Sequence, residues 1–209
     1  GAVYLNAVNA SRFETALLKT VDVQALQTDE ESVRDFARET VSYLTGGQES
    51  WNPQIVVAGV PASGFIPQSF RDHMHTVKGW FFSARAVFMA GAAIVLALLG
   101  KAVAGSKSGK SGFSAGGYYG GALLALLAIA GLGLWAYVDF DGFWAWLHEA
   151  FIPDGIFSAA EPIMALFPLE LFADYLAPVA KTFAIATAAT LALPLALVPL
   201  SRLLAAANG

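Results

Sequence analysis

Gly117-Tyr-Tyr-Gly-Gly-Ala-Leu-Leu-Ala-Leu-Leu-Ala-Ile-Ala-Gly-Leu-Gly-Leu-Trp-Ala-Tyr-Val138 runs without a single charged side chain. A helix needs about 20 consecutive, mostly apolar residues to cross the hydrocarbon core of a bilayer. Because this stretch has that length and that character, it predicts a transmembrane α-helix. It also places the chain among integral membrane proteins.

Two further stretches, residues 80–100 and 178–201, have the same character, and each holds one charged side chain, Arg85 and Lys181 respectively. The composition agrees with three spans, because only 13% of the residues are charged and 56% are hydrophobic. An average soluble domain has about 25% charged residues. None of the three stretches lies at the N-terminus, where a cleavable signal peptide would be. We therefore expect a multi-pass protein of the cell membrane.

The charges between the spans predict its orientation. Residues 101–116 carry three lysines and no acidic residue, and short lysine-rich loops stay in the cytoplasm. The connection 139–177 carries acidic residues and no Lys or Arg, so we expect it outside. The predicted segments are an extracytoplasmic domain (1–79), a transmembrane helix (80–100), a basic cytoplasmic loop (101–116), a transmembrane helix (117–138), an outer connection (139–177), a transmembrane helix (178–201) and a cytoplasmic tail (202–209).

The first 79 residues are expected to form a small, mostly helical extracytoplasmic domain. Thr28-Asp-Glu-Glu31 has the pattern of a capping box, and Gly46-Gly47 should end the helix that follows. Residues 54–66 are rich in Val and Gly and predict an extended or hairpin-like excursion. No helix breaker follows Gln68 until Gly79, so this polar stretch should be helical and continue into the first span.

The outer connection, 139–177, is too apolar to be a solvated loop. Aromatic residues gather at the membrane–water interface, and amphipathic segments can lie there in the plane of the bilayer. We expect two short helices, at about 142–151 and 159–167, broken at Pro153 and around Pro168. The predicted fold class is thus all-α: a polytopic helical membrane protein with a small extracytoplasmic N-terminal domain and interfacial or re-entrant helices.

Two histidines are the leading candidates for chemistry. His148 ends the aromatic segment Phe143-Trp-Ala-Trp-Leu-His148, and His73 lies just before the first span. Ionisable groups near bilayer depth are functional candidates by default, and a pKa of about 6.5 suits imidazole to both base and acid catalysis. We expect His148 to act as base and His73 as its partner or as an oxyanion stabiliser. Alternatively, each ring simply lies at the interface or caps a helix.

Two patches of the sequence resemble the family of the bacterial lipoprotein intramolecular transacylase (Lit). The element His73-Met-His-Thr-Val-Lys78 resembles the family's His-Met-x-Asp-Val-Lys/Arg, which stands at the outer end of a transmembrane helix. The segment that ends at His148, together with Phe157-Ser-Ala-Ala-Glu-Pro-Ile-Met-Ala-Leu-Phe-Pro168, resembles the family's aromatic–histidine segment and the Phe-rich stretch after it. The resemblance covers about residues 10–200, including the order of the spans.

The sequence also departs from that family pattern. Thr76 and Glu161 each stand where the family usually has Asp. The family has a further transmembrane helix before its extracytoplasmic domain. Either this helix precedes Gly1, or the chain is a shortened member.

The resemblance implies a specific reaction. Lit moves an acyl chain within a lipoprotein, from the glyceryl group on the N-terminal cysteine to the α-amine of that cysteine, and so gives the lyso form. No cofactor is needed, because the ester already carries the activation. Carried over by motif, His148 and His73 are the catalytic pair. The partners would be membrane lipids and, as substrate, the N-terminal diacylglyceryl-cysteine of a lipoprotein.

Three further residues are candidates for substrate binding: Arg85, Glu161 and Lys78. Arg85 lies a turn inside the first span and could hold a phosphate, an ester carbonyl or Glu161, although such a side chain also snorkels to the interface. Glu161 could orient an imidazole by accepting its N–H. Lys78 would otherwise serve to anchor its helix at the lipid head groups.

Other classes of function are also compatible with the sequence. Zinc could be held by histidine and carboxylate ligands, but no His-Glu-x-x-His motif is present. Water in place of the amine would make the protein an ester hydrolase. A non-catalytic lipid- or lipoprotein-binding accessory protein would tolerate replacement of both histidines. The net charge of −4 does not favour a nucleic-acid partner, and a chain without cysteine excludes disulfides and thiolate chemistry. The candidate zinc ligands are His73, His75, His148 and Glu149.

Overall fold

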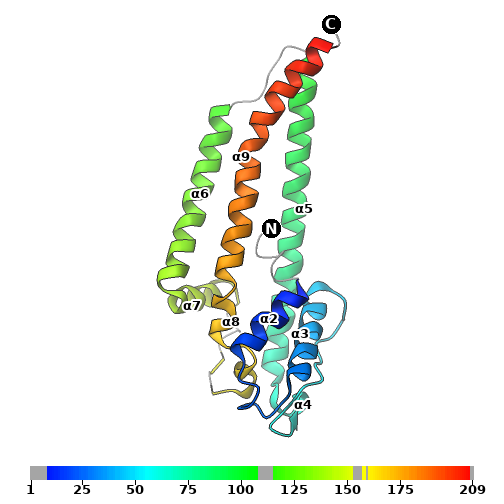
Figure 1. Ribbon diagram of the computed structural model, residues 1–209, viewed down its shortest axis with the longest axis vertical. Coiled ribbons are helices and arrows are strands. Elements are labelled where there is room, and N and C mark those ends of the chain that lie inside the picture. Colours follow the sequence, from blue (N-terminus) through cyan, green and yellow to red (C-terminus); the bar gives the residue numbers. More distant parts are fainter. Residues whose placement is uncertain (1–8, 108–114, 153–156, 159, 208–209) are drawn as a thin grey trace.

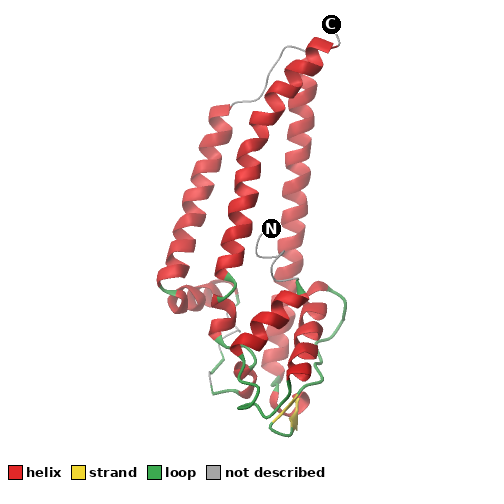
Figure 2. Cartoon of the chain, viewed as in Figure 1, coloured by secondary structure: helices red, strands yellow, loops and turns green. Residues whose placement is uncertain are grey.

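Three long helices define the shape of the molecule. The computed structural model describes residues 9–107, 115–152, 157–158 and 160–207. Helix α9 packs against both α5 and α6, and the shorter elements gather at one end of the three, as Figure 1 shows. The described chain is mostly helical, as predicted, with one small pair of strands (Figure 2). The long helices are α5 (Gln68–Lys107), α6 (Ala115–Val138) and α9 (Leu176–Ala207).

The N-terminal residues form two amphipathic helices, α2 (Ala10–Thr20) and α3 (Glu30–Thr45). Asp29, not Thr28, is the N-cap of α3: its carboxylate accepts a hydrogen bond from the Ser32 N–H at 2.8 Å. The predicted capping box was therefore wrong by one residue. The helix ends as predicted at Gly46, whose φ of +91° is the left-handed conformation that glycine adopts without strain.

A hairpin follows the second helix, as the sequence predicted. Strands β1 (Val56–Val57) and β2 (Val60–Pro61) pair antiparallel through a turn at Ala58 and Gly59, both of which have positive φ. Such a turn matches the twist of the two strands. A short helix, α4 (Ala62–Phe65), leads from the hairpin to the start of α5.

Helix α5 is continuous from the polar stretch into the predicted first span, which confirms the expected run through Gly79. It does not end near Gly100, however. Residues 101–107 of the predicted basic loop continue the helix, because Lys and Ala are good helix formers. Residues 108–114 of that loop lie outside the described residues. At the other end of the chain, α9 likewise extends beyond the predicted span, to Ala207.

The connection between α6 and α9 contains α7 (Phe140–Phe151), the 3₁₀-helix η1 (Pro162–Ala165) and α8 (Leu169–Ala173). The first predicted short helix is confirmed. The second, 159–167, was wrong, because only one 3₁₀ turn forms there and a new helix begins after Pro168. Proline is favoured at the start of a helix and disfavoured in its interior. Pro162 therefore stands at the start of η1, and Pro168 directly precedes α8. The predicted break at Pro153 lies outside the described residues.

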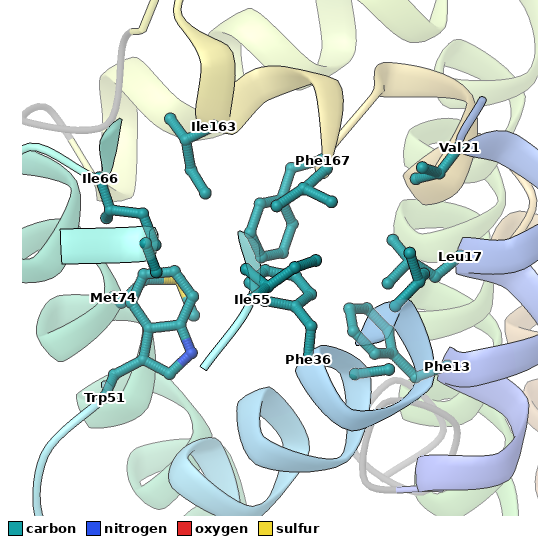
Figure 3. Packing of buried hydrophobic residues seen from close by; sticks show 14 of the residues in the cluster. Phe13, Leu17, Val21, Phe36, Trp51, Ile55, Ile66, Met74, Ile163 and Phe167 are labelled. Atoms are coloured by element: carbon teal, nitrogen blue, oxygen red, sulfur yellow. The ribbon is translucent and has the colours of Figure 1, made fainter. Parts of the chain in front are cut away.

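The core of the compact end is formed by residues from the N-terminal region and from the connection between α6 and α9. Phe36 of α3 contacts the rings of Trp51 and Phe167 at 6.0 and 5.5 Å between centroids, and Ile163 and Leu171 are fully buried in the same cluster. Figure 3 shows Ile163 and Phe167 facing Ile55 and Phe36. The expected boundary at residue 79 therefore does not delimit this core. We call the compact end the head: α2, α3, the hairpin, α4, the first turns of α5, η1 and α8.

Apolar side chains on the long helices remain uncovered. Val87 of α5 is 73% exposed, Leu124 of α6 is 71% exposed and Tyr137 is 83% exposed. By length and composition, one described helical segment, Tyr119–Val138, suffices to cross a membrane, with a mean hydropathy of 2.1. It coincides with the stretch from which the sequence predicted a span.

Candidate functional site

The structure brings the two predicted histidines together. His73 lies in the second turn of α5 and His148 in the last turn of α7, and their rings stack with centroids 6.0 Å apart and planes at 22°. Each residue is 8% exposed. Two imidazoles from distant parts of the sequence thus meet in a buried position, where the head joins the long helices.

Aromatic rings enclose this histidine pair. Phe70 and Phe157 lie 5.7 and 5.3 Å from the His73 ring, and Trp144 lies 4.5 Å from the His148 ring. Phe172 stacks on Trp144, with ring centroids 4.4 Å apart. The histidines therefore have apolar walls that limit the access of water.

These wall residues were not assigned to the site from the sequence. Phe70 precedes His73 by three residues and Trp144 precedes His148 by four, which are the spacings that place side chains on one helix face. That signal was available in the sequence. Phe157 reaches His73 from outside any helix, and no spacing rule predicts its position.

A hydrogen bond fixes the tautomer of His148. Its Nδ1 lies 2.9 Å from the carbonyl oxygen of Trp144. Because a carbonyl oxygen can only accept, Nδ1 must carry the proton. In the neutral ring Nε2 then holds the lone pair. His148 is thereby prepared to accept a proton at Nε2, as a general base must.

His73 differs from His148 in its hydrogen bonding. Its Nδ1 is buried without a hydrogen-bond partner among the described residues. Burial, and then the nearby His148, lower the pKa of His73 from 6.5 to about 4. It is therefore uncharged at neutral pH, so the pair carries at most one positive charge, which His148 gains when it accepts a proton. Within the described chain, no carboxylate bonds to either imidazole.

The three residues predicted to bind substrate do not join this pair. Lys78 donates a hydrogen bond to the Gln48 carbonyl at 2.6 Å and lies over the Tyr43 ring, so it fastens α5 to the head. Glu161 accepts from the Ser158 N–H at 3.1 Å and so holds the loop before η1. Arg85 is exposed on α5 and has no ion pair with a described residue. None of these three side chains contacts His73 or His148.

The alternative zinc site finds no geometric support. His75 lines a separate groove of the head with Arg71 and Asp72, on another face of α5 from His73. Glu149 is exposed. Within the parts of the chain that the structure describes, no three His, Asp or Glu side chains gather as metal ligands would.

Comparison with family models, with curated proteins and with solved structures finds no match to this chain. The resemblance to the Lit family thus stays a prediction that depends on the short motifs around the two histidines. The geometry of the histidine pair stands independently of it.

Proposed function

We propose that this chain is a multi-pass membrane protein that moves an acyl chain from oxygen to nitrogen within diacylglyceryl lipoproteins. The observation that carries the proposal is the buried, stacked pair of His73 and His148. It lies where the head meets α5 and α6, whose large apolar side chains are mostly exposed. An enzyme that works on a lipid-anchored peptide needs its reactive groups at that level of the membrane.

Aromatic side chains at the same level support this placement. The indole of Trp80 donates to the Phe151 carbonyl at 3.1 Å, and this links α5 to the end of α7. Trp135 at the end of α6 contacts the ring of Trp146 at 5.3 Å. Because Trp residues favour the interface between lipid and water, these contacts support an interface beside α7.

In the proposed step, the α-amine of the lipoprotein cysteine attacks the carbonyl carbon of the glyceryl ester. His148 Nε2 takes the proton that the nitrogen loses as the new C–N bond forms. The tetrahedral adduct then breaks its C–O bond, and the imidazolium returns the proton to the leaving glyceryl oxygen. The products are an amide and a free hydroxyl, so atoms and charge balance without a cofactor.

The neutral His73 beside this base has a distinct role. A protonated His73 would repel the imidazolium that forms on His148, and burial keeps it uncharged. Its ring also carries one N–H, which can stabilise the oxyanion of the adduct. Phe70, Phe157 and Trp144 limit competition by water, which favours transfer to the amine over hydrolysis.

Expression in a host that makes diacylated lipoproteins tests the proposal. Mass spectrometry of the lipoprotein N-termini should show N-acyl, lyso-form peptides of unchanged total mass. His148→Ala should lower their yield about 10²-fold or more, as expected for loss of a general base. His75→Ala is the matched control, because it removes an imidazole from another face of the same helix. Diacylated N-termini that stay unchanged with inserted wild-type protein would contradict the proposal, and a free fatty acid product would indicate hydrolysis instead.

A further inference from the structure

A second cleft lies between α2 and the start of α9. Its volume is about 240 Å³, and its lining includes Arg12, Lys19, Asp174, Tyr175 and Pro178. Arg12 and Lys19 are seven residues apart in α2, a spacing that places both on one face of a helix. Helix α2 thus presents a basic face to the point where the chain enters its last long helix.

Only one of the two basic side chains is neutralised. Lys19 pairs with Asp174 at 2.6 Å, which closes one end of the cleft. The guanidinium of Arg12 is exposed and has no ion pair or hydrogen bond with any residue that the structure describes. The cleft therefore keeps one uncompensated positive charge, carried by the side chain best suited to bind a planar or tetrahedral oxyanion.

Tyr175 lines the same cleft, and its hydroxyl also has no partner among the described residues. The oxygen is buried, and no described residue forms a hydrogen bond with it. Leaving a buried hydroxyl unpaired is destabilising, so a ligand that accepts a hydrogen bond from it would offset that cost. Burial raises the pKa of Tyr175 to about 12. The group is therefore protonated at physiological pH and can donate a hydrogen bond to an acceptor such as an anionic oxygen.

The position of the cleft fits a lipid. Pro178 begins the segment predicted as the third span, and α2 crosses beside the lower end of α9 in Figure 1. In the membrane placement proposed above, this is the level of the phospholipid phosphates. The apolar stem of the cleft, with Ala16 and Pro178 in its wall, suits the glyceryl part of such a lipid.

We propose that this cleft binds the phosphoryl group of a membrane phospholipid, with the Arg12 guanidinium pairing with the phosphate and the Tyr175 hydroxyl donating a hydrogen bond to it. The site is separate from the histidine pair and takes no part in acyl transfer. It would fix the head against the bilayer. The proposal depends on the membrane placement but not on the reaction.

Binding of dioctanoyl-phosphatidylglycerol to the full chain in detergent, followed by native mass spectrometry, tests this site. Inorganic phosphate and dioctanoylglycerol are the two comparison ligands. Arg12→Gln should weaken phosphatidylglycerol binding about tenfold and Tyr175→Phe about threefold, in line with a charge-assisted and a neutral hydrogen bond. Arg34→Gln is the control, since it removes a cation from α3 that already pairs with Glu30. Tyr175→Phe keeps the ring and removes only the unpaired oxygen, so the fold should be retained.

Comparison of the three ligands shows which chemical group the cleft binds. Binding of phosphatidylglycerol without binding of dioctanoylglycerol or inorganic phosphate identifies a lipid phosphate as the ligand. Equal binding of inorganic phosphate, lost in Arg12→Gln, supports a phosphoryl site whose ligand is the free ion. Equal effects of Arg12→Gln and Arg34→Gln, with Tyr175→Phe like wild type, would overturn the assignment of the cleft.

Discussion

The head and the long helices differ in where their apolar side chains lie, although both belong to one chain. In the head, large apolar side chains such as Phe36 and Leu17 are buried, and charged pairs such as Arg38 with Asp35 lie on the surface. On α5 and α6 many large apolar side chains are exposed, Val87 and Leu124 among them, and on the described part of α9 Ile185 is exposed. The head thus has the apolar core and charged surface that are typical of a domain in contact with water. Exposed apolar surface of this kind, as on α5 and α6, favours an apolar medium or a partner.

The two candidate histidines lie where these two regions meet. His73 belongs to a helix that runs through both regions, and His148 belongs to α7 at the base of α6. Their meeting point is the seam where the two regions join, and Phe157, which follows α7 in the chain, helps to close it. In the membrane placement proposed above, a histidine pair at this seam would reach an acyl chain from the lipid side and a peptide from the water side. Substitutions that act on one region alone therefore test the comparison directly.

The largest effect should come from the head core. Phe36→Ala should lower the free energy of unfolding of the head by about 3–5 kcal/mol, because it leaves a cavity among buried rings. Phe88→Ala, on the exposed surface of α5, should have little effect. Thermal unfolding in detergent, followed by near-ultraviolet circular dichroism, compares the two. Equal losses of stability would remove the distinction between the regions.

A charge placed on α6 should have the next largest effect. Leu127 is exposed near the middle of the predicted span. Leu127→Arg should raise the free energy of membrane insertion by about 2.5–3.5 kcal/mol, whereas Val56→Arg, in the exposed β1 strand, should be tolerated. Resistance to alkaline extraction from membranes measures insertion. If Leu127→Arg behaves like Val56→Arg, α6 does not face lipid.

The free energy of unfolding should depend on pH through His73, which lies at this seam. The pKa of His73 is about 4 in the folded protein and about 6.5 when unfolded. The unfolded state therefore binds more protons between these values, so stability should fall as pH drops from 6.5 towards 4 and level off below. The loss should be roughly 2–3 kcal/mol. In His73→Asn, which cannot titrate there, this part of the loss of stability should disappear, and an unchanged pH profile would contradict the burial of His73.

The smallest effect tests the corrected cap of α3. Asp29→Ala removes the acceptor for the Ser32 N–H, so Tm should fall by about 2–4 °C. Thr28→Ala should leave Tm unchanged, because that hydroxyl caps nothing in the described structure. The reverse order would restore the capping box that the sequence pattern first indicated.

Local signals predicted local structure well. The hairpin, the end of α3 at Gly46 and the run of α5 through Gly79 all follow from residue type and spacing. Thr28 and Asp29 are both good caps, so the sequence alone could not separate them. Proline positions showed where elements start after Glu161, but not that the result would be a single 3₁₀ turn.

Long-range contacts could not be predicted from the sequence, for a physical reason. Lys78 bonds to backbone carbonyls of Gln48 and Glu49, which no side-chain pattern reveals. Similarly, the burial of Phe167 against Phe36 folds the outer connection onto the head. That packing, which depends on shape rather than on periodicity, decides which residues surround the histidines. The histidines themselves could be chosen from the sequence, because ionisable side chains beside apolar spans are uncommon.

The most direct test of the central claim is a single-turnover reaction with purified protein in lipid vesicles. The substrate is a synthetic diacylglyceryl lipopeptide with a deuterated ester acyl chain, mixed with a second, unlabelled lipopeptide of different sequence. We expect the deuterated chain to appear as an amide on its own peptide, and His148→Ala to abolish this product while His75→Ala does not. Deuterated free fatty acid, label on the second peptide, or full activity in His148→Ala would contradict it.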